Sequence, residues 1–179
     1  MRRTAVALVA TLATTAGAAA ASVPAQASTA KVQACATNWG TGPRHAGMLV
    51  QTPVRNVRAG QHACFDRLVI DLGAGRAPGY RVRYVRAFYA DASGKLVPTK
   101  GRAKLQVSVG APAAASFNAN RRHLVNVAGF AEFRQVAGLG SFEGVTSIGI
   151  GLRIRAAFRV FVLTAAGHRP RLVIDVARR

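Results

Sequence analysis

One alternating pattern of apolar and polar residues occurs twice in the chain. Residues 67–72 (RLVIDL) return as residues 171–176 (RLVIDV), with five identical residues. Leu68, Ile70 and Leu72 alternate with the residues between them, as in a strand with one buried face. We therefore predict that both copies are strands, that they open and close one β domain, and that their Arg and Asp side chains face outward. Convergence of two core strands on the same pattern is the alternative.

Further runs of period-two alternation predict more strands. Tyr80, Val82 and Tyr84 alternate with two arginines, so this strand would bury its tyrosines and present Arg81 and Arg83 on a basic outer face. Residues 104–109 alternate in the same way. The clearest run, from Ile148 onward, places on its outer face Gly149, Gly151, Arg153 and Arg155. Outward glycines predict a bare patch on the sheet, which usually marks a bulge or the close approach of another chain.

The remaining segments are less regular. Residues 158–163 are apolar on both faces except for Arg159, which predicts a central strand. Residues 110–122 carry no period and predict a long loop, while residues 130–136 fit a helical turn or a strand. About seven short strands without a convincing amphipathic helix indicate an all-β fold, a single-domain β-sandwich of mostly antiparallel strands rather than a barrel.

The N-terminus predicts an export signal. Arg2 and Arg3 precede an apolar run, and residues 25–27 (AQA) supply the small-x-small pattern that a signal peptidase cleaves. We expect a signal peptide over residues 1–27, and no later stretch approaches the roughly 20 apolar residues that a membrane span needs. The mature protein is therefore expected to be secreted, extracellular or associated with the cell wall.

The two cysteines, Cys35 and Cys64, predict one disulfide in an exported protein. A weak lipobox before Cys35 makes a lipid anchor the alternative. The disulfide would tie an N-terminal arm, residues 28–62, to a domain over residues 63–177. Trp39 in this arm fits two interpretations, a plug at the edge of the core or an exposed platform for stacking on a sugar.

The net charge of the chain indicates what kind of partner it attracts. The chain has 25 Lys and Arg against 6 Asp and Glu, and without the predicted signal peptide its formal charge is about +17. An exported protein this basic is attracted to anionic polymers such as teichoic acids and to the carboxylates of peptidoglycan. Arginine-rich composition inherited from a genome rich in G and C is the competing explanation. Nucleic acid is not expected as a physiological partner.

The sequence offers little for catalysis. The four histidines are scattered singly, which does not fit a zinc site, so we expect neither metal nor cofactor. A glycosidase needs two carboxyl groups across one cleft. Asp71 and Asp175, equivalent in the repeat, are the one pair that neighbouring strands would bring together, but an Asp–Arg ladder across strands is ordinary sheet chemistry. We expect no catalytic residue and no enzyme activity.

Several of these segments together resemble a known family. The stretches that carry the resemblance are residues 64–72 (CFDRLVIDL), 78–85 (PGYRVRYV), 142–145 (FEGV), 158–163 (FRVFVL) and 170–176 (PRLVIDV). Over residues 63–177 the chain resembles the AMIN-like domain of exported actinobacterial proteins, a relative of the AMIN module found beside cell-wall amidases and in pilus secretins. The resemblance implies a β-sandwich that does no chemistry and binds peptidoglycan. Because the chain stops three residues after Val176, we expect no amidase domain to follow.

The sequence therefore predicts an exported, non-catalytic module that binds peptidoglycan or a teichoic-acid-like polymer through a basic sheet face. The residues assigned to this face are Arg81, Arg83, Gly149, Gly151, Arg153, Arg155 and Arg159. Two alternatives remain open. One is a secreted protein-binding or inhibitor domain that presents the loop of residues 110–122, and the other is a hydrolase with an unrecognised site.

Overall fold

The structure is a computed structural model that describes residue 35 and residues 37–178. The predicted signal peptide, residues 1–27, lies outside the described residues. Within the described part, the regular elements are nine β-strands, arranged in two antiparallel sheets. The same part contains no helix long and apolar enough to cross a membrane.

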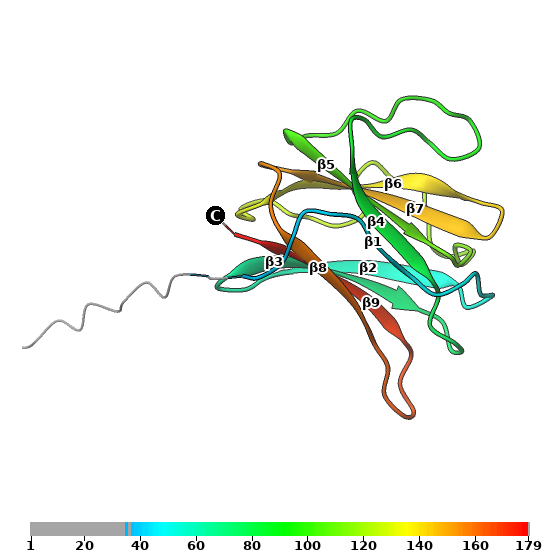
Figure 1. Cartoon of the computed structure of the whole chain (residues 1–179). Helices are drawn as coiled ribbons and strands as arrows, with labels where there is room; N and C mark the ends of the chain where they lie inside the picture. The colour runs from blue at the N-terminus through cyan, green and yellow to red at the C-terminus, as the bar shows by residue number, and fades with distance from the viewer. Residues whose placement is uncertain (1–34, 36, 179) are drawn as a thin grey trace, which may run out of the picture. The chain divides into compact units, whose positions relative to one another are not determined.

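The two sheets lie one over the other as the layers of a sandwich (Figure 1). The five-stranded sheet has the order β1-β4-β5-β7-β6, with β1 (Arg44–Ala46), β4 (Tyr80–Val85), β5 (Ala103–Val109), β7 (Val145–Leu152) and β6 (Phe133–Phe142). The four-stranded sheet has the order β2-β3-β9-β8, with β2 (Val54–Gln61), β3 (Phe65–Leu72), β9 (Arg171–Ala177) and β8 (Phe158–Leu163). The predicted all-β sandwich is confirmed.

The core lies between the sheets and is built from alternate residues of their strands. Leu68 and Ile70 of β3 are fully buried, as is Ile174 of β9. They belong to the same apolar cluster as Val107 and Ile150 of the five-stranded sheet. Alternation places these residues on the inner faces, and the removal of their side chains from water is the main stabilisation of the sandwich.

The two repeated segments are neighbours at the centre of the four-stranded sheet. They form β3 and β9, which pair antiparallel with Arg67 opposite Asp175 and Asp71 opposite Arg171. This register relates the two copies by a local two-fold axis. Both segments are strands, as predicted, but the first does not open the fold, because β1 and β2 precede it.

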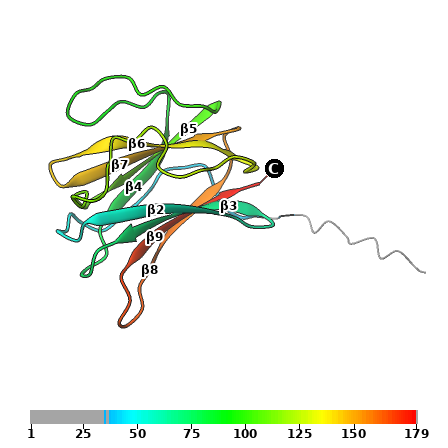
Figure 2. The same ribbon diagram turned by 180° about the vertical axis from the view of Figure 1, so that it is seen from behind.

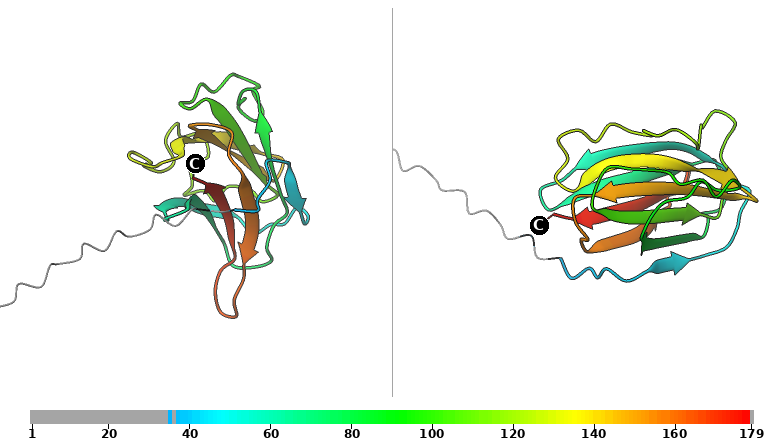
Figure 3. Two further views of the ribbon diagram at one scale, coloured as in Figure 1. Left: turned by 60° about the vertical axis from the view of Figure 1, so that its left-hand side comes forward. Right: turned by 90° about the horizontal axis from the view of Figure 1, so that it is seen from above.

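The predicted disulfide is present, and Cys35 is bonded to Cys64 just before β3. This bond excludes the lipid anchor considered for Cys35. From the disulfide the arm runs along one side of the sandwich (Figure 3). The carbonyl of Gly40 accepts a hydrogen bond from the amide of Phe158 at 3.0 Å, and β1 then joins β4 of the other sheet. The arm therefore connects the edges of both layers.

The four-stranded sheet begins earlier than the predicted boundary at residue 63. The edge strand β2 covers residues 54–61, which were predicted to belong to the arm. The register with β3 shifts between Val54 and Asn56, as at a β-bulge. Because the bulge adds one residue, the buried Val54 and Val57 are three positions apart and the period-two signal is lost.

The prediction of a central strand at residues 158–163 was wrong, because β8 is the edge of its sheet. Its outward Phe161 is partly buried for another reason. The guanidinium carbons of Arg67 and Arg159 lie 5.6 and 5.2 Å from the centre of its ring. An apolar side chain on the outer face is thus covered by neighbouring arginines instead of by another layer of the fold.

Candidate functional site

The seven residues assigned to one basic face lie on different parts of the sandwich. Arg81 and Arg83 are exposed on the outer face of β4, opposite Ser108 and Gln106 of β5. Arg159 is on β8, in the four-stranded sheet. The outer faces of the two sheets point away from each other, so Arg159 is not part of a common surface with Arg81 and Arg83.

The expected bare patch at Gly149 and Gly151 does not exist. Both glycines are buried beneath residues 86–102, which we call the covering segment and which passes over the five-stranded sheet (Figures 1 and 3). A Cβ atom on Gly149 would lie 2.8 Å from the ring of Phe88, and one on Gly151 would overlap the carbonyl oxygen of Lys100. The glycines do mark a close backbone approach, but the approaching segment belongs to the same chain.

Arg153 and Arg155 follow β7 and are held by local contacts. Arg153 Nη2 donates to Glu132 Oε1 at 2.7 Å, and the side chain of Glu132 is fully buried. The guanidinium of Arg155 lies 4.4 Å from the centre of the Tyr84 ring. Arg153 therefore neutralises an internal carboxylate. Reversing its charge would bring two carboxylates together and destabilise the fold.

The outer face of the four-stranded sheet holds a group of side chains of which Arg159 was among the predicted site residues and Arg67 and Asp175 were not. Asp175 is fully buried there, although it was expected to face outward into solvent. It accepts two hydrogen bonds from Arg67, at 2.6 and 2.9 Å, and one from Arg159 at 2.8 Å. The bond to Asp175 raises the pKa of Arg67. The carboxylate thereby fixes the position of two guanidinium groups whose outer sides reach solvent.

Aromatic rings surround these two arginines. Trp39 contacts the edge of Phe65, with 5.8 Å between the ring centres, and Arg159 lies 4.4 Å above the Trp39 ring. Phe161 lies beside both arginines. Each of the three rings is half-buried, so each keeps a solvent-facing part. We call these residues the aromatic–arginine cluster: Trp39, Phe65, Phe161, Arg67, Arg159 and Asp175.

A signal for this cluster was present in the sequence. Arg67, Asp175 and Arg159 all occupy outward positions of strands, and the pairing of β3 with β9 and of β9 with β8 places them in one row. The row depends on strand order, which the alternation does not contain. Trp39 enters from the arm, far from the strands in sequence. Its location on the outer face favours the platform interpretation over the core plug.

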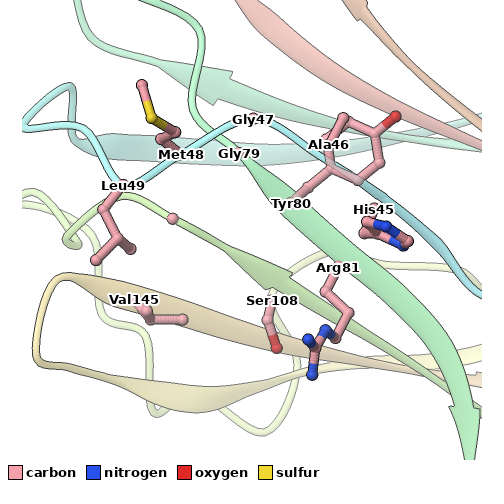
Figure 4. Close-up of a pocket in the computed structure, with 11 residues that line it drawn as sticks. His45, Ala46, Gly47, Met48, Leu49, Gly79, Tyr80, Arg81, Ser108 and Val145 are labelled. Carbon is pink, nitrogen blue, oxygen red and sulfur yellow. The ribbon is translucent and has the colours of Figure 1, made fainter.

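The outer face of the five-stranded sheet has a groove beside β1. The groove has a volume of about 490 Å³. The side chains of Arg81 and Ser108 extend to the same side of the sheet, and Met48 and Leu49 lie at the other end of the groove (Figure 4). Met48 and Leu49 are 69 and 64 % exposed. The groove combines one predicted arginine with an apolar rim and has no group of fixed charges like that at Asp175.

Neither the carboxylate pair nor a metal site gains support from the arrangement of side chains. Asp71 and Asp175 lie on rows four residues apart along the paired strands, about 13 Å, and each is bonded to arginine. This is the Asp–Arg ladder named as the alternative. Among residue 35 and residues 37–178, no group of three or more His, Cys, Asp or Glu side chains could hold a metal ion.

The loop at residues 110–122 is hydrogen-bonded to both sheets. The carbonyl of Pro112 accepts from the amide of Val54 at the start of β2, and the carbonyl of Arg121 accepts from the amide of Gly138 on β6, both at 2.8 Å. The loop predicted for these residues is confirmed. Its backbone closes one side of the sandwich, which gives it a structural role in addition to any contact with a partner.

One carboxyl group of the covering segment makes stability depend on pH. Burial raises the pKa of Asp91 above its usual 3.8, against an opposing hydrogen bond from Ser147. The folded state therefore holds this proton more tightly than the unfolded state, and the resulting stability is complete below about pH 3.8 and is lost as pH rises through the folded pKa. We expect Asp91→Asn to raise the melting temperature at pH 7 and to change it little at pH 3.5.

Thermal unfolding of both proteins at the two pH values measures this difference. Glu143→Gln, in the exposed β6–β7 turn, is the control and should give the same small change at both. A lower melting temperature of Asp91→Asn at pH 7 would contradict the assignment of a destabilising buried charge.

Comparison with known proteins identifies the family. A search of curated proteins found no significant match. The family of AMIN-like domains matches residues 52–178, which includes eight of the nine strands and both repeated segments. The match begins two residues before β2, in agreement with the boundary of the four-stranded sheet. The match points to a cell-wall-related module, and the chain belongs to the AMIN-like domain family.

Proposed function

We propose that the protein is exported and binds peptidoglycan, or an anionic polymer associated with it, without catalysing a reaction. Membership of the AMIN-like family and the disulfide support an extracellular or cell-wall location. The observation that carries the proposal is the aromatic–arginine cluster. A partly exposed ring such as that of Trp39 can stack on a sugar ring, and fixed guanidinium groups pair with the carboxylates of peptide stems.

The distribution of acidic residues strengthens the attraction to an anionic polymer. Asp66, Glu132 and Asp175 are buried and bonded to arginines, and Asp71 is bonded to Arg58. Because four of the six acidic side chains are engaged in this way, the surface arginines face few opposing charges. The positive surface attracts the polymer over a distance of about a Debye length, and the cluster then provides contact with the sugar.

Retention on purified cell walls tests the proposal. The protein should sediment with peptidoglycan at about 0.15 M salt. Trp39→Ala should weaken this retention at least tenfold, which corresponds to about 1.4 kcal/mol of lost contact. Substituting Trp39 leaves the Arg67–Asp175 and Arg159–Asp175 bonds in place, so the fold should be retained and can be verified by thermal unfolding.

The matched control is Phe142→Ala, which removes a 50 % exposed aromatic ring from the five-stranded sheet. We expect its retention to equal that of the unsubstituted protein. A salt series separates the two contributions, because the charge-dependent part decreases with salt and the aromatic part persists. Equal retention of both variants would reject the cluster as the binding surface, and no retention of the unsubstituted protein would reject the function.

A further inference from the structure

A second candidate binding site lies on the four-stranded sheet, at the opposite end of the β3–β9 pair from the aromatic–arginine cluster. A pocket of about 700 Å³ is formed between the start of β2, the end of β3 and the turn that leads into β9. This turn belongs to the β8–β9 hairpin, which projects from the sheet (Figure 2). Three arginines and a histidine line the pocket: Arg55, Arg169, Arg171 and His168.

The positive charge of the arginines that line this pocket is not balanced by an acidic residue of the pocket. Its one acidic lining residue is Asp71, whose carboxylate accepts hydrogen bonds from Arg58 Nε at 2.7 Å and Arg58 Nη2 at 2.8 Å. This bidentate contact neutralises Asp71. In the part of the chain that the structure describes, none of the three lining arginines takes part in an ion pair.

Comparison of the two repeated segments shows why Arg171 is available. At one end of the β3–β9 pair, Arg67 bonds to Asp175, the residue directly opposite. At the other end, Arg171 is directly opposite Asp71 in the same way, yet Asp71 bonds to Arg58 of β2. The local two-fold axis therefore places Arg67 and Arg171 in equivalent positions. Arg67 is bonded to the carboxylate opposite it, whereas Arg171 lines the pocket because the carboxylate opposite it is bonded to Arg58.

We propose that this pocket binds a phosphate group, such as the phosphodiester of an anionic polyol-phosphate polymer. The inference rests on the proposed function and deepens it by naming the ligand chemistry at a second site. Arginine's planar fork pairs bidentately with phosphate. A phosphodiester presents two non-bridging and two ester oxygens in a tetrahedral arrangement that several forks can approach from different sides, whereas a carboxylate presents two oxygens in one plane. The pocket has room for the alcohol on either side of the phosphate.

Titration of the purified protein with a glycerol phosphate oligomer tests the inference. The double variant Arg169→Ser/Arg171→Ser should raise the Kd for the oligomer at least tenfold, and inorganic phosphate should compete with the oligomer. The control is Arg81→Ser/Arg83→Ser, which removes the same charge from exposed positions on the other sheet and should change Kd by less than threefold. Equal weakening in both double variants would overturn the inference in favour of dispersed charge.

Two further ligands complete the experiment. Vesicles that contain phosphatidylglycerol, at the same phosphate concentration, show whether a lipid headgroup or a polymer is the better source of the phosphate. Polyglutamate of equal charge should bind the unsubstituted protein at least tenfold more weakly than the oligomer, and equal binding would overturn the assignment of phosphate.

Failure of this inference is distinguishable from failure of the proposed function. The Arg169→Ser/Arg171→Ser variant should keep its retention on peptidoglycan freed of teichoic acid, because the aromatic–arginine cluster is intact. If the unsubstituted protein is not retained on that material, binding to peptidoglycan itself is rejected, while the oligomer titration still decides whether the pocket binds phosphate.

Discussion

Replacing Asp66 by alanine should lower the free energy of unfolding by about 4 kcal/mol. Asp66 is fully buried on the inner side of β3. Its Oδ2 atom accepts hydrogen bonds from the amides of Glu132 at 2.6 Å and Phe133 at 3.1 Å, where the chain enters β6. The carboxylate therefore joins the two layers. Alanine would leave two buried amides without an acceptor, at a cost of about 1–3 kcal/mol each.

Urea denaturation of the oxidised protein measures this loss. Asp66→Asn keeps one acceptor oxygen and should lose about half as much stability. Asp71→Ala is the matched control, because Asp71 lies on the same strand but on its outer face, where its bond to the 51 % exposed Arg58 should contribute about 0.5 kcal/mol. Similar losses for Asp66→Ala and Asp71→Ala would show that Asp66 does not connect the layers.

Gly151→Ala should cost about 3 kcal/mol, at the upper end of the range for overpacking. The added methyl group would overlap the carbonyl oxygen of Lys100, a backbone atom that cannot rotate away. The covering segment would have to move off the sheet, which would weaken the bond from the amide of Lys100 to Gln135 Oε1, now 2.9 Å long. We expect the melting temperature to fall by roughly 10 °C.

Gly60→Ala provides the control for this substitution. Gly60 lies in the edge strand β2, and a Cβ atom there would have its nearest neighbour at 4.0 Å, on the flexible side chain of His62. Its melting temperature should change by no more than a few degrees. Gly149→Ala should fall between the two, because the ring of Phe88 can shift more easily than a backbone carbonyl. A neutral Gly151→Ala would mean that the covering segment is not packed on β7.

Period-two alternation predicted the strands that have one buried face. It located β3, β4, β5, β7 and β9, because their inward residues are apolar and their outward residues are mostly polar or glycine. It missed β2, where a bulge separates the inward valines by three positions. It also placed β8 at the centre of a sheet, because the pattern does not distinguish coverage by another layer from coverage of Phe161 by arginines.

The candidate site was harder to predict than the fold. The outward positions of Arg81, Arg83 and Arg159 were correct, but the sequence does not contain the strand order that separates them between two sheets. The glycines of β7 correctly indicated a close approach, but a glycine carries no information about which segment approaches it, here that of Phe88 and Lys100. The aromatic–arginine cluster depends on contacts among the arm, β3, β9 and β8, which no local pattern encodes.

The pairing of the first repeated segment with the last has a consequence for the order of assembly. Arg67 and Asp175 are 108 positions apart, and their strands form the middle of the four-stranded layer. That layer cannot be completed until β9 has been synthesised, since β2 and β3 on one side reach β8 only through β9. If such a chain crosses a membrane with its N-terminus first, it would remain unfolded during translocation until β9 emerges. It would then fold only after it has crossed the membrane.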